Sequence, residues 1–182
     1  MDTNWLDDRE LSAWQRFIAV VELLPGVLDA QLRRDAALSH FEYLVLAMLS
    51  EAPERTLRMT ALAARTSATL PRLSHVVGRL EARGLVERRT CPQDRRATNA
   101  SLTEDGWAKT VASAPGHVAA VREHVIDALT PDQVEQLRDI CEAVLRRIDP
   151  EGAMSAPYQD EVPSTPDAET IRVDGGILMP PK

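Results

Sequence analysis

The sequence predicts a mainly helical fold with one short β-hairpin. Six segments are typical of helices, because their apolar residues fall on one face or because a capping residue precedes them. Residues 85–102 contain the pattern of two short strands around a polar turn. The 182 residues are 44% hydrophobic and 27% charged, close to the averages of globular proteins, so we expect one main core.

The first helix is expected in the N-terminal 37 residues. Its apolar stripe has spacings of three, four and seven and consists of Leu11, Trp14, Ile18, Val21, Leu28 and Leu32. Pro25-Gly26 interrupt this stripe. Since proline removes an intrahelical hydrogen bond and clashes with the preceding turn, we expect a kink or break there.

Three shorter helices follow. Ser39 and Glu42 form a capping box at the start of the second helix. The third helix is expected over residues 60–65, with Thr60 as its N-cap. The fourth begins after Thr69 and ends at Gly84, because glycine favours the left-handed conformation that closes a helix.

A hairpin and a long helix come next. Residues 85–89 and 97–102 are expected to pair as antiparallel strands around a basic tip. Thr103 then caps a fifth helix, which we expect to bend or break at Pro115-Gly116 and to resume through Leu129.

The sixth helix closes the predicted fold. Thr130 and Gln133 form a second capping box, and Pro131 suits the first helical position. The apolar stripe of this helix consists of Val134, Leu137, Cys141, Val144, Leu145 and Ile148. Residues 150–182 are rich in proline and acidic side chains, so we expect a flexible tail.

Charge is distributed unevenly along the chain. The whole chain has a net charge of −7, but between Arg55 and Thr103 ten arginines face three acidic residues, a net charge of +7. A basic segment within an acidic protein is typical of a nucleic-acid-binding surface.

The fourth predicted helix has two different faces. Its apolar arc is Leu73, Val76, Val77 and Leu80, and its other side holds Pro71, Arg72, Ser74, His75, Arg79 and Arg83. One face can pack on the domain while the other enters a DNA major groove, where arginine bonds guanine and serine bonds bases or phosphate. An amphipathic surface helix with solvated arginines would show the same pattern.

Four short motifs occur in a fixed order: LSHFEY (38–43), RLEARGLVER (79–88), PQDRRA (92–97) and LTEDG (102–106). In this order and spacing they resemble the MarR family of bacterial transcription regulators, and the resemblance covers residues 11–148. It implies a winged helix-turn-helix domain with N- and C-terminal dimerisation helices. The implied parts are a dimerisation helix in 1–37, the DNA-binding domain in 38–103, dimerisation helices in 104–149 and a tail in 150–182.

The resemblance also assigns roles in DNA binding. It makes Arg95 and Arg96 the wing-tip arginines that reach a minor groove or its flanking phosphates, with Asp94 holding one of them. A narrow minor groove concentrates negative potential, which favours arginine. For one arginine, an ion pair that only stabilises the wing is an equal alternative. His75 stands where the family commonly has arginine or another polar residue, so its base preference stays open. The residues expected to bind double-stranded DNA are Thr69, Pro71, Arg72, Ser74, His75, Arg79, Arg95 and Arg96.

A homodimer is implied as well. In this family the first, fifth and sixth helices interlock across a two-fold axis, and the apolar stripes here are too extensive to stay exposed. Two-fold symmetry places the recognition helices about 34 Å apart, so the operator should be an inverted repeat. The resemblance implies a repressor released by a small molecule bound between the dimer helices and the winged domain. Five candidate wall residues, which we interpret as core or interface, are Trp14, Phe17, His40, Tyr43 and His117.

Other classes of function lack support. The chain contains no GxGxxG, GxxxxGK[ST], GxSxG or HExxH motif, so we expect no enzyme, no cofactor and no metal site. His117 and His124 lie about 10.5 Å apart along a helix and are expected at the surface or an interface. Without a run of 18 apolar residues or a secretory signal, we expect a cytoplasmic protein with no membrane partner.

Two alternatives stay open. A winged-helix module could bind protein instead of DNA, a reading that the acidic body favours and the basic segment opposes. A regulator could also sense oxidants through Cys91, whose thiol pKa the neighbouring Arg88 and Arg89 would lower. Cys141, on the apolar stripe of the last helix, is expected to be a small core residue.

Overall fold

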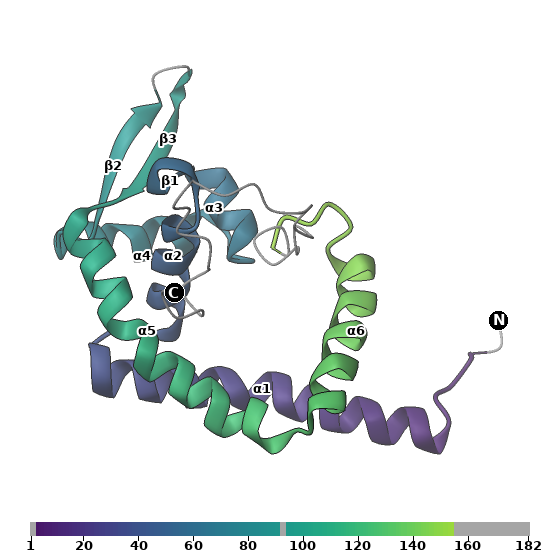
Figure 1. Cartoon of the computed structure of the whole chain (residues 1–182). Helices are drawn as coiled ribbons and strands as arrows, with labels where there is room; N and C mark the ends of the chain where they lie inside the picture. Colours follow the sequence, from purple (N-terminus) through teal and green to yellow (C-terminus); the bar gives the residue numbers. More distant parts are fainter. Residues whose placement is uncertain (1–2, 92–93, 155–182) are drawn as a thin grey trace, which may run out of the picture.

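The computed structural model describes residues 3–91 and 94–154 and confirms a mainly helical fold with a small β-wing. Single turns of 3-10 helix occur at Pro53–Arg55 and Ile126–Ala128. In chain order the other elements are α1 (Asp8–Ala36), α2 (His40–Ser50), β1 (Thr56–Arg58), α3 (Met59–Arg65), α4 (Leu70–Ala82), β2 (Val86–Cys91), β3 (Asp94–Leu102), α5 (Glu104–His124) and α6 (Pro131–Ile148). Figure 1 shows α2, α3, α4 and the sheet grouped at one end of α1, with α5 running back along α1 toward α6.

The predicted break at Pro25 does not occur. Helix α1 continues through Pro25 for 29 residues, and a capping box of Asp7 and Glu10 starts it. Proline removes the N–H that would bond the carbonyl of Val21, but Val21 lies at an exposed position where water can satisfy that carbonyl.

Helix α5 is also continuous through Pro115, and it ends earlier than predicted, at His124. Val125 has a non-helical backbone, and a 3-10 turn occupies the segment that was expected to extend the helix to Leu129. Pro131 restricts Thr130 to extended backbone, so the chain must leave the helix before α6 begins.

The winged domain is built around one core. Leu46, Leu49, Leu62, Leu73 and Leu80 from α2, α3 and α4 are fully buried in it. The three-stranded antiparallel sheet has the order β1-β3-β2. Strand β1 was not predicted, because three residues are too few to show an alternating pattern; it exists through its pairing with β3, where Leu57 faces Ala100.

Helix caps largely follow the sequence. Ser39, Thr69, Thr103 and Thr130 each accept a hydrogen bond from the backbone N–H three residues later, as predicted. Helix α3 differs, since it begins at Met59 without a side-chain cap, so the assignment of Thr60 as N-cap is wrong. Strand β1 leads straight into this helix, which leaves no room for a separate capping turn.

Two glycines have identifiable tasks. Gly84 has φ +73°, the left-handed conformation expected of a glycine that closes α4. At Gly106, an added Cβ would lie 2.0 Å from the carbonyl oxygen of Leu85. The start of α5 therefore packs directly on the backbone before β2, and this contact explains the glycine of the LTEDG motif.

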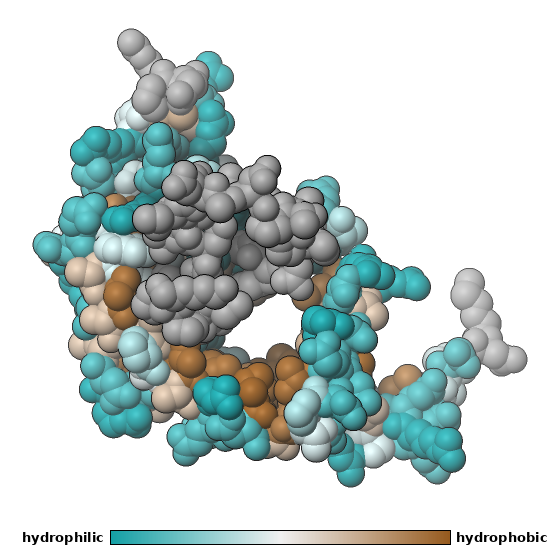
Figure 2. Space-filling model, viewed as in Figure 1, coloured by the Kyte–Doolittle hydropathy of each residue, from teal (hydrophilic) through white to brown (hydrophobic). Residues whose placement is uncertain are grey.

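Helix α6 contains no buried residue. Its apolar side chains Leu137, Ile140, Val144 and Ile148 are 37% to 73% exposed. Cys141 is exposed too, so the prediction of a core position is wrong for the single chain. Figure 2 shows apolar surface gathered along α1 and the adjoining parts of α5 and α6, whereas the surface around the β-hairpin is mostly hydrophilic.

Candidate nucleic-acid interface

Helix α4 presents two faces, as its sequence predicts. Leu73, Val76, Val77 and Leu80 are buried in the core of the winged domain. Of the residues expected to bind DNA, all those whose side chains the structure describes are exposed: Thr69, Pro71, Arg72, Ser74, His75, Arg79 and Arg96. The side chain of Arg95 lies outside the described part of the chain, so its predicted role at the wing tip is not addressed.

Two of these arginines contact the first turn of α2. The guanidinium carbon of Arg72 lies 4.3 Å from the centre of the Phe41 ring. Nε of Arg79 donates a hydrogen bond of 3.2 Å to Oε1 of Glu42. Arg83, the C-cap residue that follows α4, places Nη1 4.0 Å from Oε2 of Glu42. These contacts hold the partly exposed arginines against the first turn of α2.

Glu42 is a buried carboxylate. Its side chain is only 10% exposed, and it accepts hydrogen bonds from the backbone N–H (2.8 Å) and the hydroxyl (3.0 Å) of Ser39. Burial raises the pKa of Glu42, but the hydrogen bonds from Ser39 and the ion pair with Arg79 outweigh it, and the pKa lies below its usual value. Glu42 is therefore a charged residue beside α4 at neutral pH.

In the wing, Asp94 contacts two residues. Its Oδ1 accepts a hydrogen bond of 3.1 Å from the backbone N–H of Arg96. Its Oδ2 lies 3.8 Å from Nη1 of Arg58, at the end of β1. Asp94 thus holds the wing turn through the backbone of Arg96, and among the described side chains its ion-pair partner is Arg58 from another strand.

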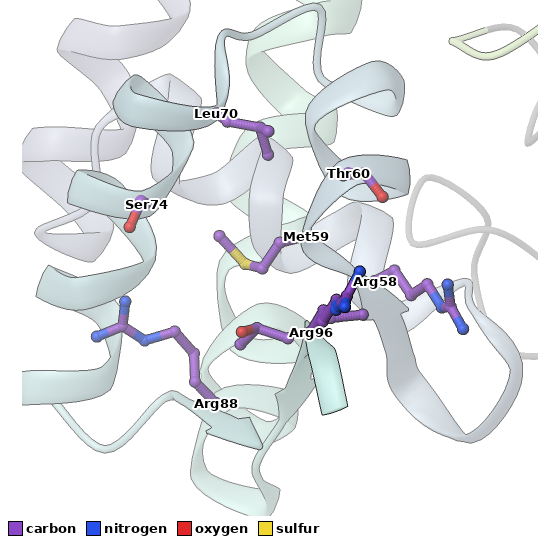
Figure 3. A pocket seen from close by; sticks show the side chains of 9 residues that line it. Arg58, Met59, Thr60, Leu70, Ser74, Arg88 and Arg96 are labelled. Atoms are coloured by element: carbon purple, nitrogen blue, oxygen red, sulfur yellow. The ribbon is translucent and has the colours of Figure 1, made fainter. Parts of the chain in front are cut away.

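A hollow of about 320 Å³ lies between α3, α4 and the hairpin. Its lining residues are Arg58, Met59, Thr60, Leu70, Ser74, Arg88, Arg96, Ala97 and Thr98. Figure 3 shows the guanidinium of Arg88 extending from β2 toward α4. Glu81 accepts hydrogen bonds from Nε (2.8 Å) and Nη2 (2.6 Å) of Arg88, and these bonds lower the pKa of Glu81. Three arginines and three hydroxyls suit a polyanion at this place.

Sequence reasoning did not assign four of the polar lining residues to DNA binding. Arg58, Thr60, Arg88 and Thr98 come from four different elements, and only the tertiary fold brings them to Ser74 and Arg96. The available signal was the basic segment as a whole, which includes both missed arginines.

Cys91 is buried, at 2% exposure. Its sulfur lies 3.6 Å from Nη2 of Arg58, which is on β1. Arg88 and Arg89 pair with Glu81 and Glu87. Burial limits access of oxidants to the thiol, so the structure disfavours the redox-sensing alternative.

A polar cluster lies beneath the winged domain, where α1, α2 and α5 meet. The His117 ring is centred 4.6 Å from the Tyr43 ring and 6.2 Å from the His40 ring. Gly116 brings α5 close to Gln31, whose side chain would lie 3.1 Å from a Cβ at that position. His117 is only 7% exposed, which excludes the expected surface position in the single chain and agrees with the alternative interpretation of this residue as part of the core.

Three atoms of this cluster have no hydrogen-bond partner within the described residues: Gln31 Oε1, Tyr43 Oη and His117 Nδ1. Burial, together with the charge of the neighbouring His40, lowers the pKa of His117 to about 4. Burial also lowers the pKa of His40 and raises that of Tyr43. The side chains of His117, His40 and Tyr43 are therefore neutral at pH 7. Over residues 3–91 and 94–154, no group of three or more His, Cys, Asp or Glu side chains could hold a metal ion.

Comparison with known proteins agrees with this geometry. The MarR family model matches residues 38–97. The HTH-type transcriptional repressor YetL of Bacillus subtilis (strain 168) is 31% identical over 134 residues, which cover 67% of this chain and 80% of that protein.

Solved structures show the same fold. Sco3205, a MarR family transcriptional regulator from Streptomyces coelicolor solved in complex with DNA, is 44% identical, with a TM-score of 0.78 over 82% of this chain and 93% of that one. AbsC, another MarR family transcriptional regulator from Streptomyces coelicolor, is 37% identical, with a TM-score of 0.75 over 80% of this chain and 98% of that one. The exposed basic face of α4, the β-wing beside it and these matches lead to one conclusion: the chain belongs to the MarR family, whose members are transcriptional regulators and not enzymes.

Proposed function

We propose that this regulator binds an inverted-repeat operator as a homodimer and represses transcription. The observation that supports DNA binding best is the exposed face of α4, with Arg72, Ser74 and His75, beside the hollow lined by three arginines. Helix α4 would enter the major groove through its first turns, and the wing would follow the adjacent backbone and minor groove. Repression is supported by the similarity to YetL, which is a transcriptional repressor.

Dimerisation is proposed from α1 and α6. A helix without any buried residue gains little stability from its own chain, and α6 leaves four large apolar side chains exposed. Trp14 and Phe17 on α1 are 51% and 45% exposed. A second copy of the chain would cover both surfaces, and equilibrium sedimentation should then give twice the protomer mass of 20.1 kDa.

By length and composition, α1 is the one helix in the described part of the chain that could cross a membrane. Only a small share of its apolar stretch is buried within the protomer. We attribute this composition to the dimer interface, because α1 packs lengthwise on α5 and its C-terminal turns bury Leu28 and Leu32 in the protein. The proposed regulator is cytoplasmic and has no membrane partner.

Release from DNA is proposed to follow the binding of a small molecule at the polar cluster of Gln31, His40, Tyr43 and His117. Buried polar atoms without partners are costly, and a ligand that bonds them removes this cost. The cluster joins the dimerisation helices α1 and α5 to α2 of the winged domain. A ligand that favours a wider dimer must bind the DNA complex more weakly, because the coupling is reciprocal.

Fluorescence anisotropy tests DNA binding directly. The full-length protein would be titrated into duplexes from the region upstream of its own gene and into scrambled duplexes, at several salt concentrations. Tight, selective binding that weakens steeply with salt is expected. Absence of binding to any duplex at low salt would overturn the proposal and favour a winged-helix module that binds protein.

A further inference from the structure

We infer that the first turn of α2 determines operator specificity by positioning the arginines of α4. In this inference Phe41 orients Arg72 and Glu42 orients Arg79, without either positioning residue contacting a base. The inference rests on the proposed function, since it concerns how a DNA-binding α4 distinguishes sequences.

The geometry places both arginines against the same turn. Arg72 and Arg79 are seven residues apart, about two helical turns, and therefore share one face of α4. That face contacts adjacent residues of α2: the Phe41 ring lies 4.3 Å from the Arg72 guanidinium carbon, and the Glu42 carboxylate lies 3.2 Å from Nε of Arg79. Phe41 precedes Glu42 along α2, and their partners Arg72 and Arg79 follow in the same order along α4.

Each contact leaves the base-reading atoms available. Stacking on Phe41 uses the flat face of the Arg72 guanidinium and keeps its N–H edge open. The bond to Glu42 uses Nε of Arg79, and both terminal nitrogens still have donors for a bidentate contact with guanine. An arginine held in this way loses less rotamer freedom when it binds its base than a freely moving one.

Glu42 is itself fixed. Ser39 donates two hydrogen bonds to its carboxylate, and the side chain is 10% exposed, so it cannot follow a moving arginine. Its charge also offsets part of the attraction that Arg79 and Arg83 exert on any DNA backbone. Non-specific affinity grows with the number of uncompensated cations, so a buried carboxylate at this place raises the ratio of specific to non-specific binding.

The replacement Glu42→Gln separates this role from helix capping. Glutamine at the third helical position completes a capping box with Ser39 as glutamate does, so the start of α2 is retained. Only the charge that holds Arg79 and Arg83 is removed. Glu87→Gln is the matched control, because it makes the same change of side chain and charge at an ion pair with Arg89, on β2.

The probe is the duplex that the full-length wild-type protein selects from a random library, together with its single-base-pair variants in one half-site. We expect Glu42→Gln to reduce discrimination at one base pair about tenfold, to bind scrambled DNA more tightly and to show a steeper salt dependence. Glu87→Gln should leave the base-pair profile unchanged. In an Arg79→Ala background, Glu42→Gln should alter the profile no further.

Phe41→Leu tests the second contact, since leucine keeps an apolar side chain but has no ring to stack on Arg72. We expect it to reduce discrimination at a different base pair from the one that Glu42→Gln affects.

Two results would overturn the inference while leaving the proposed function intact. Glu42→Gln could keep the wild-type profile, or it could weaken binding to all duplexes equally while lowering the melting temperature, which is the behaviour of a purely structural residue. If the wild-type protein selects no duplex at all, the proposed function itself fails, and that outcome is distinct from the other two.

Discussion

Replacing His117 with glutamine is expected to make the fold less sensitive to acid. The His117 ring is buried against Tyr43 and near His40, with Gln31 across from the neighbouring Gly116, and its pKa is lowered from 6.5 to about 4. A lowered pKa means that the unfolded chain binds more protons than the folded chain between these pH values. The stability that neutral His117 contributes is therefore complete above pH 6.5 and declines as the pH falls toward 4.

The magnitude follows from these two pKa values. Between pH 7.5 and pH 5 the wild-type protein should lose about 2 kcal/mol of unfolding free energy through this one group. Partial screening by nearby water reduces the expected loss to about 1 to 2 kcal/mol. Glutamine does not titrate, so the variant should lack this component of the loss.

Urea denaturation at both pH values, followed by circular dichroism at one fixed protein concentration, measures the difference. Fixing the concentration matters because the stability of a dimer depends on it. His124→Gln is the control: His124 lies on the same helix with a side chain that is 40% exposed, so it should lose stability with pH as the wild type does. Equal losses for the wild type and His117→Gln would refute the reasoning, since they would show that His117 is not held neutral by burial.

Three further predictions concern separate parts of the molecule. Arg72→Ala should weaken binding to the operator by about 1–3 kcal/mol and relax one operator position in anisotropy titrations, whereas equal losses on all sequences would assign Arg72 to a phosphate. Gly106→Ala should destabilise the fold by about 3 kcal/mol in thermal or urea unfolding, because the new Cβ would lie 2.0 Å from the carbonyl oxygen of Leu85. Gly26→Ala, where a Cβ meets nothing within 4 Å, is its control and should be neutral or stabilising; equal losses in both variants would show that the close approach at Gly106 is unimportant. Deleting residues 151–182 should leave a dimer in equilibrium sedimentation and should leave the DNA affinity largely unchanged. A monomeric truncated protein would contradict the view that the tail takes no part in dimerisation.

The elements of this fold were largely accessible from the sequence because their signals are local. The caps Ser39, Thr69, Thr103 and Thr130 each bond a backbone group three residues away, so a short stretch of sequence contains both partners. The apolar arc of α4 follows from helical periodicity alone, and it already separates the buried face from the exposed one. Neither Pro25 nor Pro115 breaks its helix, and the sequence could not show this, because whether proline interrupts a helix depends on whether solvent or packing can accommodate the missing hydrogen bond.

Which side chains from distant parts of the sequence contact one another depends on the tertiary structure alone. Arg79 lies 37 residues from Glu42, and Arg58 lies 33 residues from Cys91, so no local pattern connects either pair. The burial of His117 likewise depends on α1 and α2 closing over α5. The sequence by itself therefore determined which residues form helices, where the basic charge lies and which face of α4 meets solvent. Only the packing of distant segments decided how the α4 arginines are held and which polar groups are buried, because burial and ion pairing depend on distances in space that the order of residues does not specify.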